Sequence, residues 1–229
     1  MITANVIHRV FHIRVGTVSG TAFTIEHDER QYLVTAAHVV SSLNGPYEVE
    51  LLHENRWKKM RLELTGIASN ADIAVLAPPF QLSPALTMPI GAGGAVYGQD
   101  VYFLGFPYGI SPDSGSINRA FPFPLVKKGC LSAFTKENGA NVVLLDGHNN
   151  PGFSGGPVVF AQQGQPSTSR FKVMSVISGY RFAEEPAYQG GAATPITVRA
   201  NTGIIISYDI KHGVEEITKN PNGVQINRA

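Results

Sequence analysis

The hydrophobic residues of this chain fall into short runs rich in β-branched and aromatic residues, and turn-forming glycine and proline residues separate them. The first series of runs is Val6–Val15, Ala22–Ile25, Tyr32–Thr35, Tyr47–Leu52, Arg61–Ile67 and Ile73–Leu76. The second series is Val101–Leu104, Lys127–Phe134, Val142–Leu145, Pro157–Phe160, Lys172–Ile177 and Gly203–Ser207. Runs of this kind predict β-strands. Because no amphipathic helical pattern separates them, the pattern favours an all-β barrel or sandwich over alternating strands and helices.

A proline-rich segment separates the two series and predicts a connector, because proline cannot donate to a β-ladder. We therefore expect one domain made of an N-terminal barrel over about residues 1–80, a linker over about 81–94, and a C-terminal barrel with a helix over about 95–229. Asp209 can cap that helix, Ile210, Val214 and Ile217 share one of its faces, and residues 220–223 end it. The fold class predicted is all-β, with two six-stranded antiparallel barrels and a C-terminal α-helix.

The composition of the chain excludes some classes of partner. Lys plus Arg number 18 against 17 Asp plus Glu, so the chain has no basic excess with which to neutralise phosphates or anionic lipid. We expect no nucleic-acid partner and no membrane partner. Cys130 is the only cysteine, which excludes an intramolecular disulfide and, with no signal-peptide pattern at the start, predicts a cytoplasmic protein, bacterial in type.

The strongest candidate for chemistry is the segment Asn150–Pro157, in which glycines flank Ser154 on both sides. A serine that attacks an acyl group must be exposed at a tight turn whose N–H groups face the developing oxyanion, and glycine permits such a turn. Taken alone, the segment also suits an ordinary Gly-Pro turn. The nucleophile elbow of α/β-hydrolases is excluded by context, because strand-forming Val158–Phe160 follows and only Asp209 and His212 could complete its triad.

Two upstream segments supply partners for this serine. His38 follows an apolar strand, and Asp72 directly precedes another. Each alone is equally explained as a structural histidine or a turn-forming aspartate. Together they give the order His, Asp, Ser with separations of 72 − 38 = 34 and 154 − 72 = 82 residues, divided between the two strand series. A site in the cleft between two barrels requires that division, so we expect His38 to act as base, Asp72 to orient it and Ser154 to act as nucleophile.

Taken together, the segments around His38, Asp72 and Ser154 resemble those of the trypsin-like (chymotrypsin-fold) serine peptidases. Among these peptidases, the sequence is most similar to the bacterial Deg/HtrA type without its PDZ module. The matching segments are Gly20–Ile25, Val34–Val40, Ala71–Leu76, Tyr102–Gly109 and Asn150–Pro157. The resemblance implies peptide-bond hydrolysis without a cofactor and an oxyanion hole formed by the N–H groups of Gly152 and Ser154. It also implies that an extended peptide pairs with Ser178, Gly179 and Tyr180, and that Ser178 lies near Asp72.

The chain departs from the family at one informative place. Family members activated by proteolysis place an aspartate before the nucleophile, where a new N-terminus binds it, and this chain has Phe153 there. We therefore expect no activation by that route. An acidic preference at the first specificity pocket would involve His148 or Arg181, although each residue also suits a solvated or structural role, and the HtrA likeness favours apolar side chains.

Other candidate sites have weaker support. Cys130 has no neighbouring histidine to activate it, and His8 and His12 are too far apart along one strand to share an ion, so no metal is expected. Two functions from different classes remain: an active endopeptidase acting on proteins or peptides, and a latent or inactive module that binds extended peptides or a regulatory protein partner. The sequence leaves the physiological substrate and the oligomeric state open.

Overall fold

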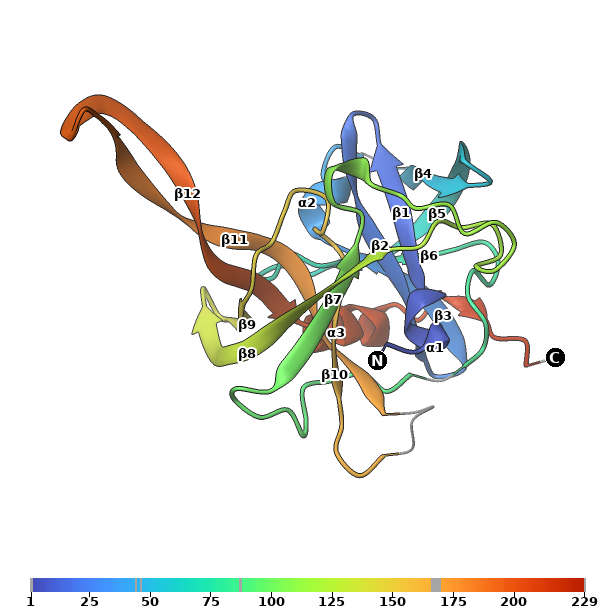
Figure 1. Ribbon diagram of the computed structural model, residues 1–229. Helices are drawn as coiled ribbons and strands as arrows, with labels where there is room; N and C mark the ends of the chain where they lie inside the picture. Colours follow the sequence, from blue (N-terminus) through green and yellow to red (C-terminus); the bar gives the residue numbers. More distant parts are fainter. Residues whose placement is uncertain (1, 44, 46, 87, 166–169, 229) are drawn as a thin grey trace.

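Two antiparallel β-sheets dominate the structure, a computed structural model that describes residues 2–43, 45, 47–86, 88–165 and 170–228 (Figure 1). The first sheet contains β1 (Val10–Val15), β2 (Val18–His27), β3 (Arg30–Thr35), β4 (Tyr47–His53), β5 (Arg56–Ile67), β6 (Ala74–Ala77) and β13 (Val224–Gln225). This sheet closes into a ring because β3 pairs with β2 on one edge and with β6 on the other. β13 occupies the rest of that second edge, beside Arg30 and Gln31.

The second sheet is a closed barrel in the order β10-β11-β12-β9-β8-β7. Its strands are β7 (Asp100–Gly105), β8 (Leu125–Glu137), β9 (Ala140–Asp146), β10 (Pro157–Ala161), β11 (Phe171–Gln189) and β12 (Ala192–Asp209). The prediction of two six-stranded antiparallel barrels is confirmed, and every predicted run overlaps a strand. The domain boundaries near residues 80 and 95 stay a prediction.

Short helices lie outside the barrels. They are α1 (Ala4–Ile7), α2 (Ala37–Val40), the 3₁₀ turn η1 (Pro107–Gly109) and α3 (Lys211–Lys219). The predicted C-terminal helix is confirmed as α3, which ends before Asn220, and Asp209 Oδ1 accepts the Lys211 N–H at its start. The predicted strand Val6–Val15 was wrong in its first part, because Val6 packs into the core from α1 and the strand begins only at Val10. None of the helices in the described residues is long and apolar enough to cross a bilayer.

Three groups of buried side chains hold the barrels together. One fills the first ring around Phe11 and Leu33, and one fills the second barrel around Phe103 and Phe153. The third lies where the two barrels meet, and its members come from both sheets and from α3. Burying apolar surface at roughly 25 cal/mol per Å² makes this shared core the main force that fixes one barrel against the other. The cleft between the barrels is therefore a rigid place for a site.

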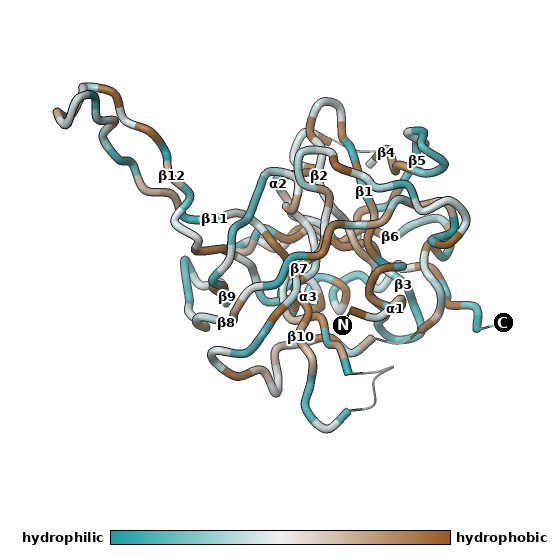
Figure 2. The backbone as a smooth tube through the Cα atoms, viewed as in Figure 1, coloured by the Kyte–Doolittle hydropathy of each residue, from teal (hydrophilic) through white to brown (hydrophobic). Residues whose placement is uncertain are grey.

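The largest departure from a compact outline is a long arm made by the ends of β11 and β12 (Figure 1). Residues 182–189 of β11 pair with residues 192–201 of β12, and hydrophilic and hydrophobic positions mix along the arm (Figure 2). The eleventh predicted strand ends at Ile177 and the twelfth begins at Gly203, so the sequence does not predict this extension. Phe182 and Tyr188 are exposed there, because the arm has no second layer to cover them.

Candidate active site

The histidine and the aspartate predicted to work together are in direct contact. His38 lies in α2, immediately after β3, and Asp72 lies in the turn between β5 and β6. His38 Nδ1 lies 2.6 Å from Asp72 Oδ2, and the backbone N–H of His38 donates to Asp72 Oδ1 at 2.9 Å. Two contacts from one residue fix both the position of the carboxylate and the orientation of the imidazole ring. With Nδ1 donating to the carboxylate, Nε2 is the nitrogen left to accept a proton.

Ser178 adds a third contact to the same carboxylate. Its hydroxyl on β11 donates to Asp72 Oδ2 at 2.6 Å, which confirms the expectation that Ser178 lies near Asp72. The alternative aspartates are elsewhere: Asp100 pairs with Lys128 on the surface, and the side chain of Asp146 is exposed. Asp72 is thus the carboxylate that the fold brings to His38.

These contacts set the charge states of the pair. The hydrogen bond that His38 donates to Asp72 raises the pKa of His38 above its ordinary value, although burial works in the opposite direction. Burial raises the pKa of Asp72, but the hydrogen bonds from His38 and Ser178 more than offset it, so the pKa of that carboxyl lies below its ordinary value. The side chain of His38 is 49% exposed and that of Asp72 is 20% exposed, so the imidazole is open to solvent while the carboxylate is largely covered. A neutral imidazole held in this way is a stronger base than a free one.

Ser154 lies in the loop between β9 and β10, and the backbone around it is held from two sides. Its carbonyl accepts the N–H of Thr21 on β2, and the next residue, Gly155, donates to the carbonyl of Ile177 on β11. A Cβ on Gly155 would lie 2.1 Å from the Thr21 carbonyl oxygen, so only glycine fits this close approach between the two barrels. The serine is therefore fixed at the junction of the barrels.

The side chain of Ser154 is directed at β11. Its hydroxyl donates to the carbonyl of Ser178 at 3.1 Å. In this arrangement Ser154, Ser178, Asp72 and His38 belong to one connected group, joined through both the backbone and the side chain of Ser178. Among the described residues, no hydrogen bond joins Ser154 Oγ to His38.

The loop before Ser154 presents two N–H groups that no partner occupies. The carbonyl of Pro151 accepts from Tyr108 N, and the carbonyl of Phe153 accepts from Gly156 N. The C=O and N–H of a trans peptide point in opposite directions, so the N–H groups of Gly152 and Ser154 point away from these partners. Within the part of the chain that the structure describes, neither N–H donates a hydrogen bond. A pair of free donors beside a serine hydroxyl can stabilise an oxyanion.

Gly152 is held in its conformation by contacts on both sides. Its φ of 106° lies in the left-handed region, and a Cβ there would come within 2.4 Å of the Phe106 carbonyl oxygen. The carbonyl of Gly152 accepts from Thr21 Oγ1 at 2.7 Å. Phe153, which stands where an activation aspartate would be, is fully buried and packs edge-to-face on Phe103 with ring centroids 5.0 Å apart.

The predicted substrate-binding residues occupy two elements. Ser178, Gly179 and Tyr180 follow one another on β11 and are half-buried, whereas His148 is exposed in the loop before Ser154. Arg181 forms a hydrogen-bonded ion pair with Glu137, so its charge is already matched. Cys130 lies partly buried in β8 and donates weakly to the Leu131 carbonyl.

The surroundings of His12 indicate a structural role. Its ring nitrogens lie 2.6 and 2.7 Å from the hydroxyls of Ser111 and Ser19, and burial lowers its pKa to about 4. His8 ends α1 instead of lying in a strand with His12, which corrects the strand geometry assumed from the sequence.

Sequence reasoning missed two residues that organise the site. Thr21 holds the Ser154 loop through its backbone N–H and its hydroxyl, and it had been noted only as part of a matching stretch. Asn149 is buried, donates from Nδ2 to the Gly179 carbonyl at 3.1 Å and accepts at its own carbonyl from Asn201. Its place between His148 and Asn150 was the only available signal, because both contacts are remote in sequence.

Comparisons with known proteins identify the family and the fold. The sequence model of the family described as a trypsin-like peptidase domain matches residues 20–166, a range that contains His38, Asp72 and Ser154. A search of curated proteins finds no match to the chain.

Among solved structures, the HtrA-type protease AlgW with a tripeptide is similar, with a TM-score of 0.61 and 19% identity over 93% of this chain and 60% of that chain. The Rv3671c protease of M. tuberculosis in an inactive form gives a TM-score of 0.60 and 20% identity over 95% of this chain and 91% of that one. The serine endoprotease from Yersinia pestis gives a TM-score of 0.59 and 18% identity over 94% of this chain and 63% of that one. This chain spans about 60% of the length of the HtrA-type protease. At these identities the likeness establishes the fold.

Proposed function

Because the chain belongs to the trypsin-like peptidase family, we propose that it is a serine endopeptidase that hydrolyses peptide bonds through an acyl-enzyme intermediate. The observation that carries this proposal is the pair of contacts between His38 and Asp72, at 2.6 and 2.9 Å. A module that only bound peptides would gain nothing from a carboxylate that fixes the tautomer of an exposed imidazole.

In the first half of the reaction, Ser154 Oγ rotates from the Ser178 carbonyl towards His38 Nε2 and gives it the hydroxyl proton while attacking the substrate carbonyl carbon. The negatively charged oxygen of the tetrahedral intermediate accepts hydrogen bonds from the N–H groups of Gly152 and Ser154. His38 then returns the proton to the leaving amine, and the C–N bond breaks to give the acyl-enzyme. Asp72 stays ionised and stabilises the imidazolium.

In the second half, a water molecule replaces the amine. His38 takes a proton from the water as it attacks the ester carbonyl, and the same two N–H groups receive the new oxyanion. Collapse of the intermediate breaks the bond to Ser154 Oγ, which regains its proton from His38. The reaction needs no metal and no cofactor, because every proton transfer uses His38.

The substrate in this proposal is an extended stretch of protein or peptide. β11 pairs with β10 only as far as Val176, so the edge of β11 at Ser178, Gly179 and Tyr180 is open to another strand. A similar HtrA-type structure is described as carrying a tripeptide, which supports binding of a short peptide by this chain as well. We further propose that His148, which is exposed in the loop before Ser154, contacts the residue that precedes the scissile bond.

A second candidate function has its own observation. Ser154 Oγ donates to the Ser178 carbonyl at 3.1 Å instead of to His38. A latent peptidase whose serine turns towards His38 only when a substrate or a regulatory protein binds would show this arrangement. We also propose that the protein is cytoplasmic. Its one cysteine, Cys130, is unpaired, and proteins of reducing compartments rarely depend on disulfides.

Hydrolysis of an unstructured protein by the wild type and by Ser154→Ala tests the proposal. Ser154→Ala should retain the fold and lower turnover by roughly six orders of magnitude, because the three residues act as a unit. Undiminished hydrolysis by this variant would exclude the assignment. A wild type that is inactive until a peptide or partner is added would support the latent form instead.

A further inference from the structure

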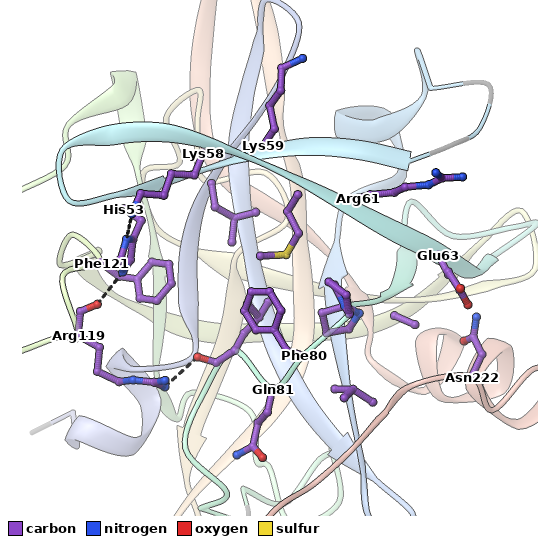
Figure 3. A pocket seen from close by; sticks show the side chains of 17 residues that line it. His53, Lys58, Lys59, Arg61, Glu63, Phe80, Gln81, Arg119, Phe121 and Asn222 are labelled. Carbon is purple, nitrogen blue, oxygen red and sulfur yellow. Dashed lines mark hydrogen bonds between the residues drawn. The ribbon is translucent and has the colours of Figure 1, made fainter.

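The first sheet contains a cavity of about 870 Å³ that none of the active-site residues lines (Figure 3). It lies between β5 on one side and, on the other, Ala77 at the end of β6 with residues 78–82 that follow it; Arg119 and Phe121 lie at one end. The volume is in the range of sites that bind ligands. The peptidase activity proposed above gives this cavity no role.

The cavity exists because β6 is too short to close the ring along its whole length. β6 ends at Ala77, and Pro78 and Pro79 follow, which cannot donate to a ladder. It pairs with β5 only at Glu63–Ile67. The remaining part of β5, Arg56–Leu62, therefore pairs with β4 on one edge and has no strand on the other. The matching gap beside β3 is filled by β13, whereas within the described residues no strand fills the gap beside Arg56–Leu62 of β5.

The hairpin register indicates which backbone groups face this open edge. Glu54 and Asn55 form a two-residue turn with φ values of 53° and 55°, so the flanking pair His53↔Arg56 exchanges both hydrogen bonds. Hydrogen-bonded pairs alternate along an antiparallel ladder. The N–H and C=O groups of Trp57, Lys59 and Arg61 consequently point away from β4.

The cavity lies along this strand edge and not against one face of the sheet. Consecutive side chains on a strand point to opposite faces. Nevertheless the four consecutive residues from Lys58 to Arg61 all line the cavity. That is possible only where the cavity follows the edge itself. Five residues of strand, from Trp57 to Arg61, span roughly 17 Å, which matches a peptide of similar length.

Side chains give the cavity an apolar lining and a basic rim. Met60 and Phe121 line it, and Phe80 does so while 55% exposed. Four lining residues carry a full positive charge and one carries a negative charge: Lys58, Lys59, Arg61 and Arg119 against Glu63. Lys58 and Lys59 are paired with Glu54 and Glu48. Within the described ranges, neither Arg61 nor Arg119 has a carboxylate partner; Arg119 instead donates to the Leu82 carbonyl.

We propose that this cavity is a docking site for an extended acidic peptide segment, which binds as an added strand on the Trp57–Arg61 edge of β5. Its apolar side chains would contact Met60, Phe80 and Phe121, and its carboxylates would face Arg61 and Arg119. Basic residues also protect an open edge from chance pairing with other chains. Protection needs no apolar cavity beside the edge, however, and positive charges that repel a basic strand attract an acidic one.

A peptide-binding measurement on the Ser154→Ala protein tests the proposal without cleavage of the probe. The probe is a seven-residue peptide in which aspartate alternates with valine, labelled with fluorescein, and its binding is followed by fluorescence anisotropy. Two matched peptides serve as controls: one with lysine in place of aspartate, and one with two adjacent central N-methyl groups, which obstruct both of its edges. We expect each control peptide to bind at least about tenfold more weakly, a difference of about 1.4 kcal/mol.

A pair of protein variants separates backbone pairing from charge. Lys59→Pro removes an N–H that faces the open edge and no hydrogen bond to β4, whereas Lys59→Ala removes the charge and keeps the N–H. Binding should fall about tenfold or more in Lys59→Pro, and about two- to threefold in Lys59→Ala. Should Lys59→Pro fail to fold, the N-methylated peptide gives the same test on the unaltered strand.

Equal binding of the plain and N-methylated peptides, or of the aspartate and lysine peptides, would overturn the proposal. So would dimerisation of the protein that the aspartate peptide cannot displace, because the edge would then pair with a second copy of the chain. None of these outcomes depends on whether Ser154 is catalytic.

Discussion

Thr21 Oγ1 donates a hydrogen bond of 2.7 Å to the carbonyl oxygen of Gly152. Thr21 is on β2 of the first sheet and Gly152 lies in the loop of the second barrel, so this contact joins the two halves of the molecule at the oxyanion donors. The same hydroxyl oxygen accepts the N–H of Phe106 at 3.2 Å. Thr21 is fully buried, so no water can replace either contact.

Replacing Thr21 tests whether this contact shapes the site. Thr21→Val keeps the volume but leaves the Gly152 carbonyl and the Phe106 N–H without a partner, which costs about 1–3 kcal/mol. We expect the peptide bond before Phe153 to move and kcat to fall about 10- to 100-fold with little change in KM, because the oxyanion donors act mainly in the transition state. Thr21→Ser, which keeps the hydroxyl, is the matched control. Equal kcat values for the two variants would show that Thr21 only fills space.

Asp72→Asn tests the orientation of the base. Asparagine preserves the shape of the side chain but favours the imidazole tautomer with the proton on Nε2, so turnover should fall by roughly 10⁴. Steady-state kinetics of Asp100→Asn and Asp146→Asn provide the controls, since neither carboxylate contacts His38 in the described structure. If one of these two variants were the damaging one, the aspartate of the triad would have been misassigned.

The pH dependence follows from the direction of the His38 shift. The base must be neutral, and the hydrogen bond that His38 donates to Asp72 raises the pKa of His38 above 6.5. We therefore expect kcat/KM to rise with pH through a midpoint above 6.5 in the wild type and through a lower midpoint in Asp72→Asn. A wild-type midpoint at or below 6.5, or one that Asp72→Asn leaves unmoved, would contradict the role given to the contact.

The same shift predicts a pH-dependent contribution to stability. Protonated His38 favours the folded state below its unfolded pKa of 6.5, and this contribution is lost as the pH rises through the higher pKa of the folded protein. For Asp72, whose folded pKa is lowered below 3.8, the contribution is present above that value and is lost as the pH falls.

The sequence predicted the barrels and the three candidate catalytic residues because both leave local signals. Alternating apolar runs bounded by glycine and proline mark strands, and the glycines around Ser154 mark a turn that Cβ atoms at positions 152 and 155 would obstruct. Thr21 and Asn149 left no such signal, because their partners lie far away in the chain. The arm was missed because polar and apolar residues mix along it without a regular alternation, with Glu184 and Glu185 adjacent and no core to impose one.

The open edge of β5 was also only partly predictable from the sequence. Its residues were predicted only from Arg61 onwards, because Lys58 and Lys59 interrupt the apolar pattern. The strand forms nevertheless, since the two-residue turn at Glu54 and Asn55 aligns it with β4. Pro78 and Pro79 mark the end of β6 in the sequence, but whether that end leaves part of β5 uncovered depends on the register between strands, which no local pattern indicates.

Reaction of the intact chain with a fluorophosphonate, followed by mass-spectrometric mapping of the adduct, tests the central claim most directly. The probe bonds only to a serine that a neighbouring base activates. Because Phe153 is fully buried and carries no charge to bind a new N-terminus, no proteolytic activation should be needed. We predict one adduct, on Ser154, formed by the uncleaved protein and abolished in His38→Ala. An adduct on another residue, or an intact chain that reacts only after cleavage near its start, would contradict the account.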